Sequence, residues 1–509
     1  MTDVPGLLRE RRPSQVGLAT SIPKLNGRIY TPPAVASRLF DLLPWPPGPL
    51  LDPACGDGVF LAEALRRIAR LAPGRAADCP ITGWDVDEEA LALARARLAV
   101  VAAETGLPAP VLYQRDALDP GEEGRFACVV GNPPYLEAKR MPASLQARIR
   151  AACPVAARGA FDLYGAFVER AHALVGPGGA FGFVLPDRFL VTAYAEGLRR
   201  LLLEDGSIRV VDLTREAVFE DAAVYPVLLA VVRSGAPRYR VEDPSGAGAD
   251  LPVDVLSGPL DGLMPLPDPS VGRLLARVLA DRRLVPLGSV VRPRWCVSFH
   301  RAGLRDRYTF DHRPNTPFAR PFLGGGRFAG NREVEPFRIA WAGGWIDYDE
   351  ARARADRNPL PAAEQFQPPQ VVICQNARRS RAALDAQGFV LKDTFLSLRC
   401  LRRVDAALGW PEWVTILLNS ACCHVIYEAL YGGTRKAGGF LHFLPRYLDP
   451  FPVPPPPPGA RAFHDRLAAA ARQGATTLAA LEAETVVRTA WGVTPDESVL
   501  LDARPVPEP

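Results

Sequence analysis

Short apolar runs alternate with helical patterns from about residue 48 to 235, and this alternation constrains the fold more than any other feature. The runs "GPLLD" (48–52), "ITGWD" (81–85) and "FACVVG" (126–131) have the length of buried strands, and amphipathic helical segments separate them. Strands that alternate with helices form parallel sheets, because each helix carries the chain back to the start of the next strand. We therefore predict an α/β fold with a doubly wound, mostly parallel, Rossmann-like sheet, and assign it to residues 1–235.

The pattern changes after residue 236, where turn residues, arginines and aromatic residues dominate. We expect an α+β domain over residues 236–460, which includes one long helix at about 411–432. The run "FPVPPPPPGA" (451–460) predicts a stiff, extended segment. A helical segment, 461–509, follows, with a single alanine-rich amphipathic helix expected at about 461–491.

The composition excludes several classes of protein. No apolar stretch is long enough to span a bilayer, and the first residues lack the apolar core of a secretory signal, so we expect a cytoplasmic protein. The nine cysteines contain no C-x-x-C pair and the six histidines no H-x-x-x-H pair, so we predict reduced, mostly buried thiols and no metal site. The net charge of +4 does not by itself indicate nucleic acid.

Acidic residues end the first three strands of the predicted sheet. Asp52 precedes a turn that contains Gly56 and Gly58, and glycines let the backbone approach a ligand closely. Asp85 ends the next strand, where a ribose diol is commonly bound, and Asp116 follows the third, where it could accept a hydrogen bond from an adenine amino group. Each could instead cap a helix. The three together indicate a nucleoside ligand.

Asn132, Pro133, Pro134 and Tyr135 follow the fourth strand. A conjugated exocyclic amino group, or an amide nitrogen, is a poor nucleophile because its lone pair is delocalised. The Asn132 side chain and the rigid Pro133 carbonyl can accept both of its N–H bonds, which exposes the lone pair, while Tyr135 offers a face to a planar substrate. This chemistry depends on orientation and electrostatics. In isolation, the same residues also suit a surface turn.

"NPPY" (132–135), preceded by "DPACGDGVF" (52–60), resembles the S-adenosylmethionine-dependent DNA adenine-N6 methyltransferases of restriction-modification systems. The order of the motifs is that of the gamma, TaqI-like class, and the resemblance is strong over about residues 25–235. It implies that a C-terminal domain recognises double-stranded DNA.

The resemblance also implies a role for individual residues. Thr31 and Asp52 are expected near the methionine end of the cofactor, Asp85 at the ribose and Asp116 at the adenine. The other expected cofactor-binding residues are Pro53, Ala54, Cys55, Gly56, Gly58 and Phe167. The expected catalytic residues are Asn132, Pro133, Pro134, Tyr135 and Phe219, of which Tyr135 and Phe219 stack on a flipped adenine.

The arginines of the C-terminal half fit a DNA-binding role. Ten arginines stand against four acidic residues between 291 and 341, and aromatic residues are interspersed among them. The segments 378–381 and 434–436 form a second basic cluster. A solvated arginine-rich surface is the alternative.

Three other functions share parts of this pattern. A protein glutamine methyltransferase activates an amide nitrogen with the same motif, but this chain is long for that class. An RNA base methyltransferase and a non-catalytic DNA-binding subunit are further alternatives. We expect a monomer and, if a restriction endonuclease accompanies it, a separate chain.

Overall fold

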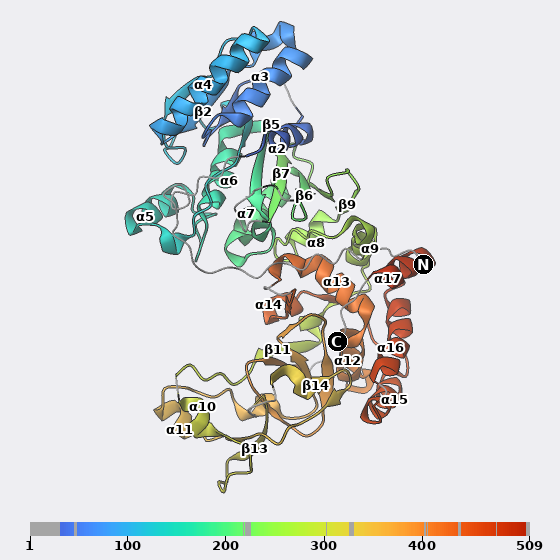
Figure 1. The fold of residues 1–509 in the computed structure, drawn as a ribbon. Helices are drawn as coiled ribbons and strands as arrows, with labels where there is room; N and C mark the ends of the chain where they lie inside the picture. Colours follow the sequence, from blue (N-terminus) through green and yellow to red (C-terminus); the bar gives the residue numbers. More distant parts are fainter. Residues whose placement is uncertain are drawn as a thin grey trace, which may run out of the picture. The chain divides into compact units, whose positions relative to one another are not determined.

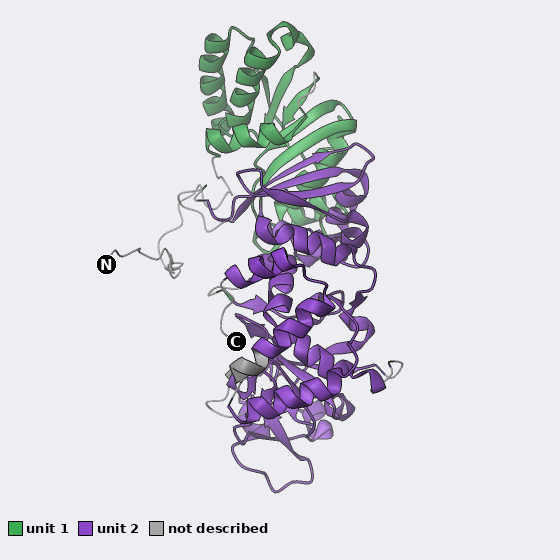
Figure 2. Cartoon of the chain, turned by 90° about the vertical axis from the view of Figure 1, so that its right-hand side faces the viewer, with its two compact units in different colours: residues 1–185, 217–224, 436–439 green, residues 186–216, 225–435, 440–509 purple. Residues whose placement is uncertain are grey.

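The computed structural model describes residues 31–44, 48–216, 218, 225–301, 303–324, 330–401, 404, 406–435, 439–474 and 476–504. The chain divides into two compact units, shown in Figure 2. Unit 1 contains residues 1–185, 217–224 and 436–439, and unit 2 contains 186–216, 225–435 and 440–509.

A nine-stranded sheet has the order β3-β2-β1-β4-β5-β7-β6-β8-β9 (Figure 1). Its strands are β1 (Leu50–Asp52), β2 (Ile81–Asp85), β3 (Val111–Gln114), β4 (Phe126–Gly131), β5 (Val175–Pro186), β6 (Ser207–Asp212), β7 (Pro226–Val232), β8 (Arg238–Glu242) and β9 (Gly248–Leu251). The pairings among β1 to β5 are parallel, whereas β6 pairs antiparallel with β7. The predicted doubly wound, mostly parallel sheet is thereby confirmed.

Helices alternate with the strands of unit 1, as the sequence predicts. They are α2 (Pro33–Leu42), α3 (Val59–Leu71), α4 (Glu88–Thr105), α5 (Ala143–Ala152) and α6 (Leu163–Leu174). Local chemistry sets their ends. The Asp87 side chain accepts a hydrogen bond from the Glu89 amide at the start of α4, and Gly106, in the left-handed conformation, follows its last turn.

The strand order reverses at β1, which lies between β2 and β4. Leu50 of β1 pairs with Cys128 of β4, and Leu51 pairs with Val129, so the carboxyl ends of these two strands are neighbours. Asp52 and Asn132 follow those ends. In open parallel sheets this reversal point opens a crevice for ligands, and the fold thus places both predicted motifs beside it.

Unit 2 begins with α7 (Glu196–Asp205), α8 (Val253–Ser257) and α9 (Pro269–Ala280), together with β6 to β9. Strands β8 and β9 continue the nine-stranded sheet beyond residue 235. The functional division of the chain at residues 235 and 460 stays a prediction.

Small sheets form the rest of unit 2. One has the order β11-β21-β17-β19 and another the order β12-β16-β13-β20. Their strands are β11 (Val291–Trp295), β12 (Thr309–Phe310), β13 (Ala319–Leu323), β16 (Trp345–Asp347), β17 (Gln370–Cys374), β19 (Ala382–Asp385), β20 (Val390–Leu391) and β21 (Phe395–Cys400). Two-stranded pairs complete them, namely β10 (Val285–Pro286) with β23 (Pro452–Val453), β14 (Val334–Glu335) with β15 (Arg338–Ile339) and β18 (Asn376–Ala377) with β22 (Leu441–His442).

Two helices that the sequence predicts as continuous are broken, so both predictions were wrong in this respect. The segment predicted at 411–432 forms α12 (Trp410–Asn419) and α13 (Ala421–Tyr431), because the Ser420 hydroxyl accepts a hydrogen bond from the Cys423 amide and starts a new helix.

The final helix is also divided, into α15 (Ala460–Arg472) and α16 (Thr476–Ala490), and α17 (Pro495–Ala503) follows. Gly474 between them has a φ of +90°, which a helix cannot contain.

Among the described residues, a single helix with the length and hydropathy of a membrane span is not found. Only the bent pair 410–419 and 421–434, with 77° between its halves, meets those criteria together. The nine cysteines are unpaired, and all but Cys400 are buried, as expected from the sequence.

Candidate active site

The loop after β1 is held on β2 by backbone and side-chain hydrogen bonds. The Cys55 amide donates to the Trp84 carbonyl at 2.9 Å, and the Gly56 amide donates to Asp85 Oδ2 at 2.8 Å. Gly56 and Gly58 have φ values of +52° and +80°, in the region that favours glycine. A Cβ at Gly56 would meet no atom within 4 Å, so the loop leaves open space there.

Asp52 is completely buried, with 0% of its surface exposed. Its Oδ1 accepts a hydrogen bond from the Ala54 amide at 3.1 Å, whereas its Oδ2 has no hydrogen-bond partner among the described residues. Burial raises the pKa of the Asp52 carboxyl well above its ordinary value, the Ala54 amide opposes this, and the nearby Asp85 and Asp57 add to it. A buried carboxylate oxygen without a donor is costly, and a cationic ligand group such as an ammonium would satisfy it.

Asp85 and Asp116 occupy the neighbouring strand ends, as predicted, but each already has protein partners. Asp85 Oδ1 accepts from the Asp87 amide at 3.0 Å. Asp116 Oδ1 accepts from the Leu118 amide at 2.9 Å, and its Oδ2 forms an ion pair with Arg148 of α5. No sequence pattern indicated Arg148, because α5 is distant from Asp116 along the chain.

Asn132 follows β4, where Gly131 lies against Asp52: a Cβ at Gly131 would be 2.8 Å from Asp52 Oδ1. The Asn132 side-chain Nδ2 donates to the hydroxyl of Thr31 at 3.0 Å, and Thr31 is only 6% exposed. This bond orients the amide, so that its carbonyl oxygen points away from Thr31. Pro133 is buried beside it.

Tyr135 is fixed at both ends. Its hydroxyl donates to the Val184 carbonyl of β5 at 3.0 Å, and its ring meets Tyr164 of α6 edge to face, with 5.9 Å between the centroids. Burial raises the pKa of Tyr135, so the hydroxyl stays a donor at neutral pH. Tyr164 and Val184 were not identified from the sequence.

The remaining site predictions concern the walls of the site. Phe167 is buried on α6, Pro53 and Cys55 are buried in the loop, and Ala54 and Pro134 are half-buried. Val86 is 63% exposed and offers an apolar surface directly after Asp85. It was not among the predicted site residues, although it follows a strand end as they do. Phe219 lies outside the described residues.

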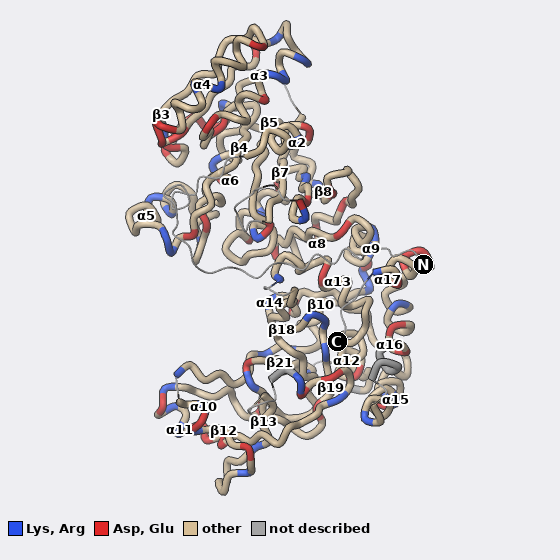
Figure 3. Tube along the Cα trace, in the orientation of Figure 1, with Lys and Arg blue, Asp and Glu red and all other residues tan. Residues whose placement is uncertain are grey.

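The predicted basic clusters contain arginines of different kinds. Several are engaged within the protein: Arg307 with Asp356, Arg338 with Glu335, and the half-buried Arg379 with the Asn419 carbonyl at 2.8 Å. Three lie over aromatic rings, namely Arg313 on Trp345, Arg320 on Tyr348 and Arg378 on Phe440. Figure 3 shows lysines and arginines in blue near the labels of β10 and β21. Arg327, Phe328 and Lys436 lie outside the described residues.

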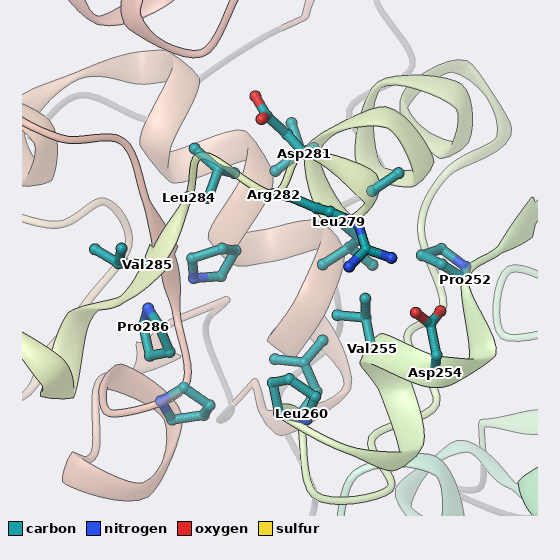
Figure 4. Close-up of a pocket in the computed structure, with 15 residues that line it drawn as sticks. Pro252, Asp254, Val255, Leu260, Leu279, Asp281, Arg282, Leu284, Val285 and Pro286 are labelled. Atoms are coloured by element: carbon teal, nitrogen blue, oxygen red, sulfur yellow. The ribbon is translucent and has the colours of Figure 1, made fainter.

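A separate apolar pocket of about 370 Å³ lies in unit 2 (Figure 4). Proline and aliphatic side chains from α8, α9 and β10 form most of its wall, with Asp254, Asp281 and Arg282 among them. None of the predicted site residues lines this pocket. The candidate site at the ends of β1 and β4 is therefore identified by the arrangement of its polar side chains and not by the volume of a cavity.

Two segments of the chain are similar to known protein families. Residues 97–219 match the Eco57I restriction-modification methylase family, and residues 328–453 match the TaqI-like C-terminal specificity domain. The chain therefore contains one segment similar to restriction-modification methylases and one segment similar to TaqI-like specificity domains. The methylase match contains Asp116, Asn132 and Tyr135.

Curated relatives agree with this assignment. The Type II methyltransferase M.PaeR7I of Pseudomonas aeruginosa is 32% identical over 243 residues, which are 42% of each chain. M.XhoI of Xanthomonas vasicola is 31% identical over 237 residues, or 42% of this chain and 43% of that protein. The chain thus spans about two-fifths of the length of these relatives.

A similar fold occurs in the Type IIL restriction-modification enzyme MmeI, solved in complex with DNA. The similarity covers 92% of this chain and 73% of that chain, with a TM-score of 0.51 and 13% identity. S-adenosylmethionine is the cofactor that suits the methylase domain, and the buried Asp52 oxygen and the open loop at Gly56 fit its charged methionine end.

Proposed function

We propose that the chain is a site-specific DNA methyltransferase that transfers a methyl group from S-adenosylmethionine to N6 of a flipped adenine in duplex DNA. The observation that carries the proposal is the Asn132 amide, oriented by Thr31 at the carboxyl end of β4 and next to the buried Asp52. The TaqI-like specificity domain supports DNA as the substrate.

The residues of the chain divide the work of binding and chemistry. Asp52 and the Gly56 loop hold the methionine end of the cofactor, and Asp85 and Asp116 hold its nucleoside. Bound S-adenosylmethionine supplies an electrophilic methyl group on a sulfonium. Asp85, which accepts from the Gly56 and Asp87 amides, is the acceptor proposed for the ribose hydroxyls.

Asn132 and Pro133 prepare the nucleophile. The Asn132 carbonyl and the Pro133 backbone carbonyl accept the two N–H bonds of the target amino group, and this withdraws its lone pair from the ring. Tyr135 stacks on the extruded base with its ring fixed by Val184 and Tyr164. Base stacking of this kind contributes roughly 1–3 kcal/mol, which offsets part of the cost of unstacking.

The test uses purified full-length protein with methyl-labelled S-adenosylmethionine and duplex DNA of varied sequence. Digestion to nucleosides and mass spectrometry should show N6-methyladenine. Label on cytosine N4 would retain the amino-group chemistry but refute the base assignment. Label only on RNA or on protein glutamine would refute the proposal and favour one of the alternative methyltransferases.

A cytoplasmic monomer, and a restriction endonuclease on a separate chain, complete the proposal. Size-exclusion chromatography with light scattering tests the first. A nuclease assay on unmethylated DNA tests the second, since cleavage by this chain alone would contradict a separate endonuclease.

A further inference from the structure

Strand β11 lies outside the segment that matches the specificity domain, yet it completes that domain's sheet. It pairs antiparallel with β21, and the register places Arg292 opposite Arg399 and Arg294 opposite Ser397. The nearby pair β10 and β23 joins the same region to residues 452–453. The recognition unit of this chain therefore extends back to about residue 285.

A polar cleft of about 380 Å³ opens beside β11. Arg292, Arg294, Ser289, Gly288 and Asp449 contribute to its wall. Arg292 and Arg294 are exposed, and they lie two residues apart on one strand, so their side chains leave the same face. Two guanidinium groups thus share one cleft with one carboxylate.

The charged side chains of this cleft form no close pair with the described residues. The side chains of Arg292, Arg294 and Asp449 make no hydrogen bond and no ion pair to the described residues. Other arginines of the predicted basic cluster, such as Arg307 and Arg338, are paired with carboxylates. The cleft accordingly presents unused donors and an unused acceptor side by side.

The backbone holds Asp449 in place. The Gly288 amide donates to the Asp449 carbonyl at 2.8 Å, and a Cβ on Gly288 would come within 2.7 Å of Asp449 Oδ1. Glycine at 288 therefore allows a close approach that any other residue would prevent. Burial raises the pKa of Asp449, while Arg292 and Arg294 act to lower it.

Arginines contact either the phosphates or the base edges of DNA, and a site that combines donors with an acceptor suits the two differently. A phosphate accepts hydrogen bonds only, and the Asp449 carboxylate would repel it. A G·C base pair offers both kinds of partner in the major groove, since guanine O6 and N7 accept while cytosine N4 donates. An A·T pair also offers both kinds of partner, but arginine pairs bidentately with guanine O6 and N7, and aspartate accepts from cytosine N4, so these side chains favour G·C.

We propose that the Arg292–Arg294–Asp449 cleft reads a G·C base pair of the recognition sequence. An arginine donates to guanine, and Asp449 accepts from the cytosine amino group. The inference rests on the proposed function, because it requires that unit 2 recognises duplex DNA.

The test starts with the wild-type full chain, whose recognition sequence is determined by methylation-sensitive sequencing of host DNA. Methylation rates are then measured for Arg292→Ala, Arg294→Ala and Asp449→Asn on the cognate duplex and on every single-pair substitution of it. Arg354→Ala is the matched control, because Arg354 is an exposed arginine of unit 2 paired with Glu350. Thermal unfolding and S-adenosylmethionine binding confirm that each variant is folded.

The expected result is a fall of roughly 5- to 150-fold in kcat/KM on the cognate duplex for at least one arginine variant. Discrimination should be lost at one G·C position and retained at the others, and Asp449→Asn should relax the same position. The control should match the wild type.

Three outcomes overturn the inference. The first is a recognition sequence without a G·C pair, the second is unchanged discrimination, and the third is an equal loss on all sequences with a flatter salt dependence, which indicates phosphate contact. A wild-type protein that methylates no DNA overturns the proposed function as well, whereas an active wild type with any of these outcomes overturns only the base-reading role.

Discussion

Replacement of Asp52 by asparagine should stabilise the protein without cofactor and weaken cofactor binding. Both effects come from the change at Oδ2. Asp52 is 0% exposed and its Oδ2 lacks a hydrogen-bond partner among the described residues, so the empty protein bears the cost of a buried carboxyl oxygen. That cost is about 1–3 kcal/mol. The asparagine side chain would keep the oxygen that accepts from Ala54 and remove the charge, but its NH2 group would lie where Oδ2 stands, so the gain lies at the low end of this range.

The size of each effect follows from this geometry. A gain of about 1 kcal/mol in the free energy of unfolding raises Tm by roughly 2–4 °C for a unit of 150–250 residues. Loss of a charge-assisted hydrogen bond to the cofactor ammonium, at about 1.5–3 kcal/mol, weakens S-adenosylmethionine binding by roughly 10- to 150-fold.

The stabilisation should also depend on pH. Because burial raises the pKa of Asp52 in the folded protein, the folded state binds more protons than the unfolded state between the two pKa values. Wild-type stability therefore falls as pH rises from about 4, the unfolded value, through the folded pKa. The Asp52→Asn variant does not undergo this loss, so the difference in Tm between variant and wild type should grow with pH.

Differential scanning calorimetry and titration calorimetry with S-adenosylmethionine measure the two effects. Asp57→Asn is the control in the same loop, because Asp57 is ion-paired with Arg97 at 2.5 Å and its loss should not raise Tm. Cofactor affinity within twofold of wild type for Asp52→Asn would refute the role of Asp52. A lower Tm for the empty variant would show that the carboxylate stabilises the loop.

Three further predictions concern catalysis, the C-terminal helices and DNA binding. Asn132→Ala should lower kcat by on the order of 100-fold or more while DNA affinity in a binding assay stays within a few-fold, and turnover above a third of wild type would contradict its role. Glu484→Gln should lower Tm, because the Glu484 carboxylate accepts hydrogen bonds from the first amides of α13 and pairs with Arg488. Each hydrogen bond to a charged group contributes roughly 1.5–3 kcal/mol to the free energy of unfolding. An unchanged unfolding curve would be inconsistent with this role. The neighbouring residues Arg378 and Arg379 should differ in their effects. Arg378→Ala should reduce the slope of log affinity for DNA against log salt concentration by about one unit, whereas Arg379→Ala should lower Tm. Equal behaviour of the two variants would contradict this difference.

The parts of the fold that follow from local patterns were predictable. The strands that end at Asp52, Asp85 and Gly131 are short apolar runs followed by turn residues, and the structure contains them as β1, β2 and β4. The meeting of Asp52, Asp85 and Asn132 at one edge of the sheet followed too, because the carboxyl ends of parallel strands lie side by side, whereas their roles stay predictions.

Breaks within helical patterns were not predictable from periodicity. The apolar period continues through Ser420, and only the hydrogen bond from the Cys423 amide to its hydroxyl shows that α12 ends there. Contacts between distant residues of the candidate site were not predictable from the sequence either. Thr31 and Asn132 are far apart in the chain, and no local pattern indicates that the hydroxyl of one accepts from the amide of the other.

The arginines show most clearly why a basic sequence does not define a DNA-binding surface. Charge counts treat Arg307, Arg378 and Arg379 alike, yet Arg307 pairs with a carboxylate, Arg378 lies over an aromatic ring and the half-buried Arg379 donates to a carbonyl. A guanidinium has five N–H donors, so an arginine contacts DNA only with those that the folded protein leaves free. That condition depends on partners brought from elsewhere in the chain, as Asp449 is brought to β11. If the Arg292–Arg294–Asp449 cleft reads a base pair as proposed, unused donors beside an acceptor, and not the density of arginine, separate it from an ordinary charged surface.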